Sequence, residues 1–156
     1  MAVGLVVFVG FILLGRPLVE GRLTAARNLD RATAMIPGTD GALVTIGAEV
    51  HASSATSSTD SNGEAQAAIS DARSILQEAA LLSQTGYDKL TEDEQRRARI
   101  VEAMATARIE ALDAAEAVLS AGAESSATAE GSEQRIRDYD KAMEKVRGAD
   151  AALGKL

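Results

Sequence analysis

The chain opens with an uninterrupted apolar segment. Residues 2–15 (AVGLVVFVGFILLG) carry no polar side chain, and the apolar run reaches Val19 if Arg16 extends its guanidinium to a lipid head group. A membrane-spanning helix needs about 20 apolar residues, within a range of about 17–25. A secretory signal would have a basic start and an A-x-A cleavage site, and this sequence has neither. Residues 1–19 are therefore predicted to form a single transmembrane anchor; the alternatives are a cleaved signal and a buried or partner-bound helix.

The next segment, 20–37, has the apolar spacing of a helix. A stripe at steps of three, four and seven residues comprises Leu18, Ala25, Leu29, Ala32 and Ile36. This spacing predicts a juxtamembrane helical stalk, which Pro37 and Gly38 end.

Arginines follow the apolar run closely. Arg16, Arg22 and Arg27 are candidates for contact with anionic lipid head groups, although a solvated helix face explains them equally well. By the positive-inside rule, these arginines would place the domain that follows the anchor in the cytoplasm. The alternative is an extracytoplasmic domain.

Residues 38–63 change in character. The stretch ALVTIGAEV (42–50) is rich in β-branched residues and partly alternating, whereas ASSATSSTDSNG (52–63) is a polar, low-complexity linker. We expect a flexible loop with a possible short strand, or an extended segment that binds a partner. The candidate interaction residues in it are Leu43, Val44, Ile46 and Val50.

Residues 64–156 predict three helices. Ser61 with Glu64, and Thr91 with Glu94, fit capping boxes that open helices running to about Gln84 and Ala121. Gly86 supplies the stop of the first of these helices. Ser132 opens a last helix with a heptad-like stripe, typical of a coiled-coil seam. The candidate interaction residues on that stripe are Ile136, Tyr139, Met143 and Val146. The fold class is therefore mainly α: an anchor, a stalk, and an Ala-rich up-down three-helix bundle or an extended helical hairpin plus a helix.

Composition narrows the function classes. Hydrophobic residues make up 46% of the chain, but alanine supplies much of this fraction and aromatic residues only 3%. Such a core gains little from burial and suits helices that pack closely or associate with another chain. The net charge of −7 argues against a nucleic-acid partner, which requires a basic face. Without cysteine the chain has no disulfide, thiolate or Cys-based zinc chemistry.

No catalytic, cofactor or metal motif is found. His51 is the single histidine and lies among linker serines, a setting that does not hold catalytic geometry. Neither a Glu-x-x-His pair nor a phosphate-binding glycine motif is present. The sequence therefore predicts no enzyme, no cofactor and no small-molecule substrate.

These observations favour a non-catalytic, membrane-anchored accessory or scaffold subunit of a larger membrane complex. Its partners would be other membrane subunits or the chain itself, together with the lipid bilayer. Two alternatives remain open: a self-associating membrane scaffold or sensor that uses the last helix, and a helical carrier of an apolar ligand.

Overall fold

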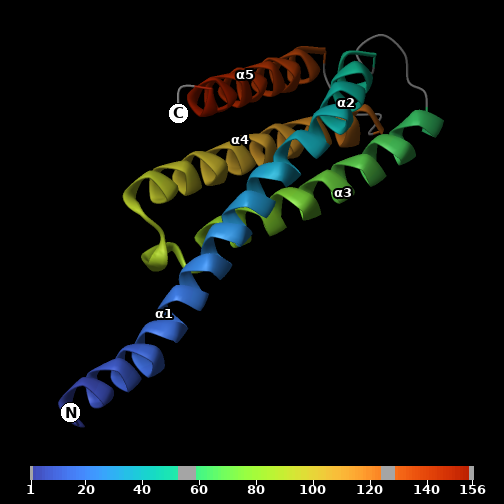
Figure 1. The fold of residues 1–156 in the computed structure, drawn as a ribbon. Coiled ribbons are helices and arrows are strands. Elements are labelled where there is room, and N and C mark those ends of the chain that lie inside the picture. Colours follow the sequence, from blue (N-terminus) through green and yellow to red (C-terminus); the bar gives the residue numbers. More distant parts are fainter. Residues whose placement is uncertain (1, 53–58, 124–128, 155–156) are drawn as a thin grey trace.

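The computed structural model describes residues 2–52, 59–123 and 129–154, with side chains over 19–52, 63–121 and 130–154. Every element in these ranges is a helix, so the mainly-α prediction is confirmed (Figure 1). The elements in chain order are α1 (Ala2–Met35), η1 (Ile36–Thr39), α2 (Asp40–Ala52), α3 (Thr59–Gln84), η2 (Tyr87–Lys89), α4 (Glu92–Ala123) and α5 (Ala129–Leu153).

The helices form an up-down bundle. The helices α3 and α4 are antiparallel neighbours, α5 packs along the other side of α4, and α1 and α2 lie end to end across α3 and α4 (Figure 1). The predicted bundle of 64–156 is thus joined by residues from the predicted stalk and loop, which share its core. The N-terminal half of α1 extends beyond the bundle (Figure 1).

The core is built mainly from alanines and branched aliphatic residues. Small buried residues let the helix backbones come close together, whereas each large aliphatic side chain contributes about 1.5–3 kcal/mol when fully buried. The largest apolar side chains with less than 2% exposure are Leu29, Ile36, Ile46, Ile69, Leu76, Leu112, Leu119, Val50 and Val101. The predicted stripe of 20–37 is confirmed over Ala25, Leu29, Ala32 and Ile36, all of which are buried.

Residues 40–52 correct the prediction of a loop or short strand, because they form the helix α2. Leu43, Ile46 and Val50 are three and four residues apart, so a helix places all three on one face, and all three are buried. Burying that face against α3 and α4 outweighs the strand preference of the β-branched residues. The linker residues 53–58 lie outside the described residues, and residues 59–63 belong to α3.

The helix punctuation is largely as predicted. The Thr91–Glu94 capping box is present: the Thr91 amide and hydroxyl each donate to Glu94 Oε2 at 2.8 Å, and the Glu94 amide donates to Thr91 Oγ1 at 3.4 Å. Gly86 follows α3 with a φ of 75°, the left-handed conformation that glycine adopts without strain. The side chain of Ser61 lies outside those described, and α5 begins before Ser132.

The structure contradicts the predicted single-pass membrane localisation. Within the described residues, no helix is long and apolar enough to cross a membrane. The apolar run 2–15 has fourteen residues, which rise about 21 Å in a helix, whereas a bilayer core is about 30 Å thick. The backbone of α1 continues through Pro17 to Met35, and its second half packs into the bundle. The side chains of residues 2–18, on which the anchor prediction depends, lie outside those described.

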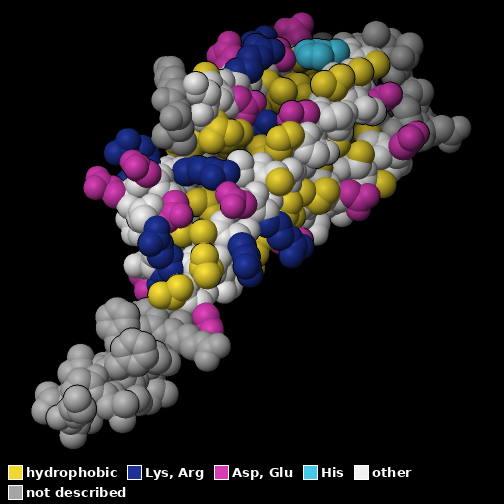
Figure 2. All heavy atoms as spheres, viewed as in Figure 1, with side chains coloured by type: hydrophobic (Ala, Val, Ile, Leu, Met, Phe, Trp, Pro, Cys, Tyr) yellow, Lys and Arg dark blue, Asp and Glu magenta, His cyan; other side chains and the backbone are white. Residues whose placement is uncertain are grey.

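Polar pairs join neighbouring helices at the bundle surface. Basic and acidic side chains are intermixed on the face that Figure 2 shows. The pairs are Arg31–Glu78 (2.7 Å), Arg97–Asp30 (3.0 Å), Arg73 with Asp113 and Glu116 (2.6 Å each), and Lys145–Glu110 (2.6 Å). Each exposed pair contributes at most about 1 kcal/mol to stability. Because the many core alanines are alike in shape, packing alone distinguishes helix registers weakly, and the ion pairs together favour one register.

Candidate functional site

A buried arginine marks the junction of α2, α4 and α5. The side chain of Arg108 on α4 is only 3% exposed. Its Nη1 and Nη2 donate to the two carboxylate oxygens of Asp150 on α5, at 2.6 and 3.1 Å, and Nη2 also donates to Asp40 on α2 at 2.9 Å. This fork-on-fork geometry makes strong, directional ion pairs. One side chain therefore ties three helices together.

The charge on Arg108 is held firmly. Burial lowers the pKa of the guanidinium, but the hydrogen bonds to Asp150 and Asp40 outweigh burial and raise that pKa above its ordinary value. Its Nε is buried and has no hydrogen-bond partner among the described residues. An arginine that stays charged does not transfer protons, so the role of Arg108 in this cluster is to hold the three helices in position.

A second contact joins α2 to α5 through Tyr139. The Tyr139 hydroxyl lies close to Gly47, and a Cβ added at Gly47 would be 2.8 Å from it. The ring of His51, one turn further along α2, meets the Tyr139 ring edge-on with centroids 6.1 Å apart, and His51 Nε2 lies 3.5 Å from Asp140 Oδ1. Burial, together with the charge of Asp140, raises the pKa of the Tyr139 phenol. The tyrosine is therefore a neutral packing group against a glycine notch.

The structure gathers most of the predicted interaction residues into its own core. Leu43, Ile46, Val50, Tyr139 and Val146 are buried, and Ile136 and Met143 are half-buried against the same core. Val44 is the exception, with 75% of its surface exposed. A partner could reach Val44 directly, but it could reach the buried side chains only by opening the bundle.

The arginines predicted to meet a membrane surface are spread along α1. Arg22 and Arg27 are exposed on the part of the helix that packs in the bundle. The side chain of Arg16 lies outside those described.

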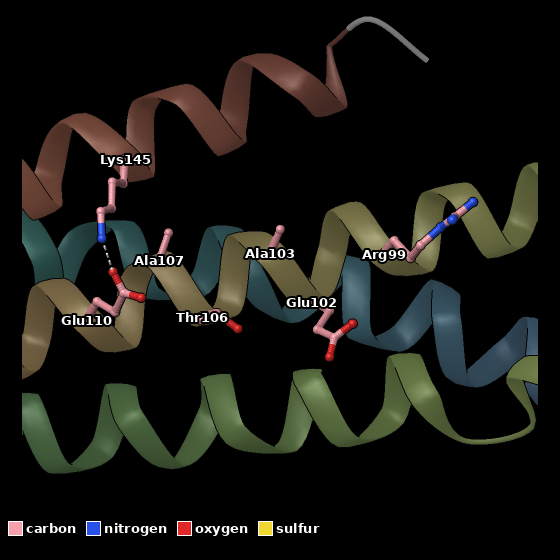
Figure 3. A pocket seen from close by; sticks show the side chains of 7 residues that line it. All are labelled: Arg99, Glu102, Ala103, Thr106, Ala107, Glu110 and Lys145. Atoms are coloured by element: carbon pink, nitrogen blue, oxygen red, sulfur yellow. Dashed lines mark hydrogen bonds and ion pairs between the residues drawn. The ribbon is translucent and has the colours of Figure 1, made fainter.

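A shallow groove lies on the outer face of α4, which is flanked by α5 and α3 (Figure 3). Its volume is about 320 Å³, and its floor is made of the small residues Ala103, Thr106 and Ala107. The charged residues around this floor are Arg99, Glu102, Glu110 and Lys145. Lys145 Nζ is 2.6 Å from Glu110 Oε2, and Gln84 Nε2 on α3 donates to Glu102 at 2.5 Å. Open, shallow and framed by charge, the groove has the character of a protein contact surface and not of an enclosed ligand cavity.

Acidic residues are frequent, yet they are dispersed. Over the described residues, no group of three His, Asp or Glu side chains is placed to hold a metal ion. Three of the seven acids of α4 pair with cations on neighbouring helices: Asp113 and Glu116 with Arg73, and Glu110 with Lys145.

Sequence reasoning missed Arg108. A signal was present, because Arg108 follows Met104 by four residues and precedes Leu112 by four, which places a charge on the buried stripe of its helix. A charge in that position requires partners, but their identity depends on contacts with helices 68 and 42 residues away in sequence. The groove residues carry no sequence motif.

Comparison with known proteins gives no relative: no family model, no curated protein and no solved structure matches this chain.

Proposed function

We propose that this chain is a non-catalytic scaffold or accessory subunit that binds another protein through the N-terminal half of α1. The observation that carries the proposal is the reach of α1 past the bundle, because the part that extends bears the apolar run 2–15 (Figure 1). An apolar helix of this length is unfavourable in water and needs a surface that covers it.

The closed core supports this choice of binding element. Except for Val44, the predicted interaction residues of α2 and α5 already pack within the chain, so the bundle needs no partner to cover them. The second half of α1 contributes Ala25, Leu29 and Ala32 to that core. A partner bound to the first half would therefore be held by a continuous helix that is fixed to the bundle.

The binding mode is a helix lying in an apolar groove of the partner. In this mode, side chains at spacings of three, four and seven residues enter the groove and supply most of the affinity. The run has no charged residue before Arg16, so a predominantly apolar groove fits it. Val19 and Leu23, 59% and 51% exposed on the next turns of α1, extend this surface toward the bundle.

The test is affinity purification of the full chain with a C-terminal tag, followed by mass spectrometry of the proteins recovered with it. The double substitution Val6→Glu and Val9→Glu places two charges in the apolar run. The control, Ser74→Glu with Gln77→Glu, places the same charge on the exposed surface of α3.

We expect a stoichiometric protein partner with the unaltered chain and with the control, and loss of that partner with the α1 variant. Recovery of the chain with lipid and without a protein would contradict the proposal. Retention of the same partner by the α1 variant would also contradict it, because binding would then reside elsewhere on the bundle.

A further inference from the structure

The outer face of α4 carries a stripe whose residues are all exposed. Its members follow one another at steps of three and four residues: Arg96, Arg99, Ala103, Thr106, Glu110 and Asp113. Contact positions in paired helices recur at the same steps, although in a coiled coil the residues at these positions are apolar. The groove of Figure 3 is lined by four residues of this stripe, Arg99, Ala103, Thr106 and Glu110.

The charges on this stripe are ordered. Both basic residues, Arg96 and Arg99, precede the small residues, and both acidic residues, Glu110 and Asp113, follow them. Suppose that two copies of α4 pack antiparallel, with the two-fold axis between residues 104 and 105. Arg99 of each copy then faces Glu110 of the other, and Arg96 of each copy faces Asp113 of the other. The small Ala103 would then face Thr106 at the centre, where close approach of the backbones is required.

Self-complementarity of this kind is the requirement of an isologous dimer, in which one patch meets itself. The two arginines are available for it, since neither forms an ion pair or a side-chain hydrogen bond with any residue that the structure describes. The two acids do have partners within the chain, Lys145 and Arg73. Each of these pairs uses one carboxylate oxygen, which leaves the other oxygen for a second cation.

The neighbouring helix adds an independent observation. Gln84 of α3 bonds Glu102 of α4, and Arg73 of α3 bonds Asp113 of α4, so the two antiparallel helices keep register over eleven residues. This register places Leu81 of α3 level with the centre of the α4 stripe. Leu81 is 69% exposed, and it lies three residues before Gln84, so the two side chains are neighbours on the surface of α3. An exposed leucine at the level of the proposed axis gives a dimer an apolar contact at its centre.

We infer that the α4 stripe, with Leu81 beside it, is an interface for a second copy of this chain. The interface brings α4 against α4 and α3 against α3, both antiparallel. Its ion pairs lie near solvent, so association weakens as salt rises. The surface lies on the bundle and not on the N-terminal half of α1, so the inference does not depend on the proposed function.

The test uses two charge-reversed full-length chains. One carries Arg96→Glu and Arg99→Glu, which makes all four charged positions of the stripe acidic. The other carries Glu110→Lys and Asp113→Lys, which makes all four basic. A control chain carries Arg22→Glu and Arg27→Glu on exposed positions of α1, and so has the same net charge as the acidic chain.

Sedimentation equilibrium up to about 1 mM chain covers even a weak dimer. We expect the unaltered chain and the control to form dimers, and each reversed chain alone to associate about tenfold or more weakly. A mixture of the acidic and the basic chain should restore the dimer, since every facing pair is then opposite in charge. Circular dichroism of each chain checks that it is folded.

Restoration in the mixture can come only from this face, because association through α1 is unchanged in both reversed chains. Reversed chains that dimerise as well as the unaltered chain would overturn the inference. So would a mixture of folded acidic and basic chains that stays monomeric, or an unaltered chain that is monomeric over the whole concentration range.

Discussion

The ion pairs of Arg108 predict an unequal response to removal of their two ends. Replacing Arg108 with methionine keeps an unbranched apolar stem at a site that is only 3% exposed, and removes a buried Nε that lacks a partner among the described residues. The two carboxylates left behind are 58% exposed for Asp40 and 41% exposed for Asp150, so water can solvate them. Replacing Asp150 with alanine instead leaves a buried guanidinium with one carboxylate in place of two.

The sizes of these effects follow from solvation. Removing one partner of a buried pair costs about 3–5 kcal/mol when the remaining charge stays buried, whereas replacing buried charges by packed apolar groups is often neutral or stabilising. We therefore expect Asp150→Ala to lower the free energy of unfolding by about 3 kcal/mol, and Arg108→Met to change it by less than about 1 kcal/mol. In the double variant the loss caused by Asp150→Ala should largely disappear, because no buried charge remains.

The assay is urea unfolding followed by circular dichroism at 222 nm, which reports the helices of a chain without tryptophan. Unfolding midpoints are compared at equal slope, so that a shift reports stability alone. An Arg108→Met chain that is destabilised as much as Asp150→Ala, or more, would contradict this prediction. It would mean that the gain from the ion pairs over the desolvation of the guanidinium exceeds the stabilisation from a methionine packed at the same site.

Two further predictions concern single contacts. The hydrogen bond from the Thr91 amide, and then that from the Thr91 hydroxyl, lower the pKa of Glu94 from its ordinary value of 4.5. The contribution of the ionised Glu94 to the free energy of unfolding is therefore complete above that value, and it is lost as pH falls through the lower pKa of the folded state. Urea unfolding should show Glu94→Gln to be destabilising at pH 7 and the difference to shrink toward pH 3; a difference that grows would contradict the sign. Gly47→Ala should be destabilising in the unaltered chain, because its Cβ meets the Tyr139 hydroxyl at 2.8 Å. In a Tyr139→Phe background it should stabilise by about 1 kcal/mol through helix propensity, and equal effects in both backgrounds would remove the proposed clash.

The helices with one clear apolar stripe could be predicted from the sequence. The capping box at Thr91 and Glu94 sets the start of α4, and Gly86 ends the turn after α3, because both signals act over a few residues. Such local signals do not depend on the rest of the fold.

The helix α2 could not be predicted in the same way. Its β-branched residues and Gly47 favour a strand or a loop locally, and the helix forms because Leu43, Ile46 and Val50 find a core to enter. That core includes α3 and α4, which are distant in sequence. The prediction of a membrane anchor at residues 1–19 was wrong for a related reason: apolar composition predicts a helix that needs to be covered, but it does not identify what covers that helix.

The Arg108 cluster shows where a charge on a buried stripe is informative and where it is not. The position predicts that partners must exist, since an unpaired buried charge is very costly. It does not identify Asp40 and Asp150, because these residues meet only when α2 and α5 both pack against the same guanidinium. The α4 stripe could not be identified from the sequence either. Its order of charges indicates an interface only once the structure shows that this face of α4 is exposed.

Site-specific photo-crosslinking in cells identifies which part of this chain meets a partner protein. A photoreactive phenylalanine analogue is placed at Phe8 in the apolar run of α1 or, as a matched position, at Tyr139 in the core of the bundle. We expect position 8 to crosslink to a distinct protein, and position 139 to crosslink only within this chain. A protein crosslink from position 139 together with none from position 8 would contradict this expectation, because the partner would then bind the bundle and not the extended helix.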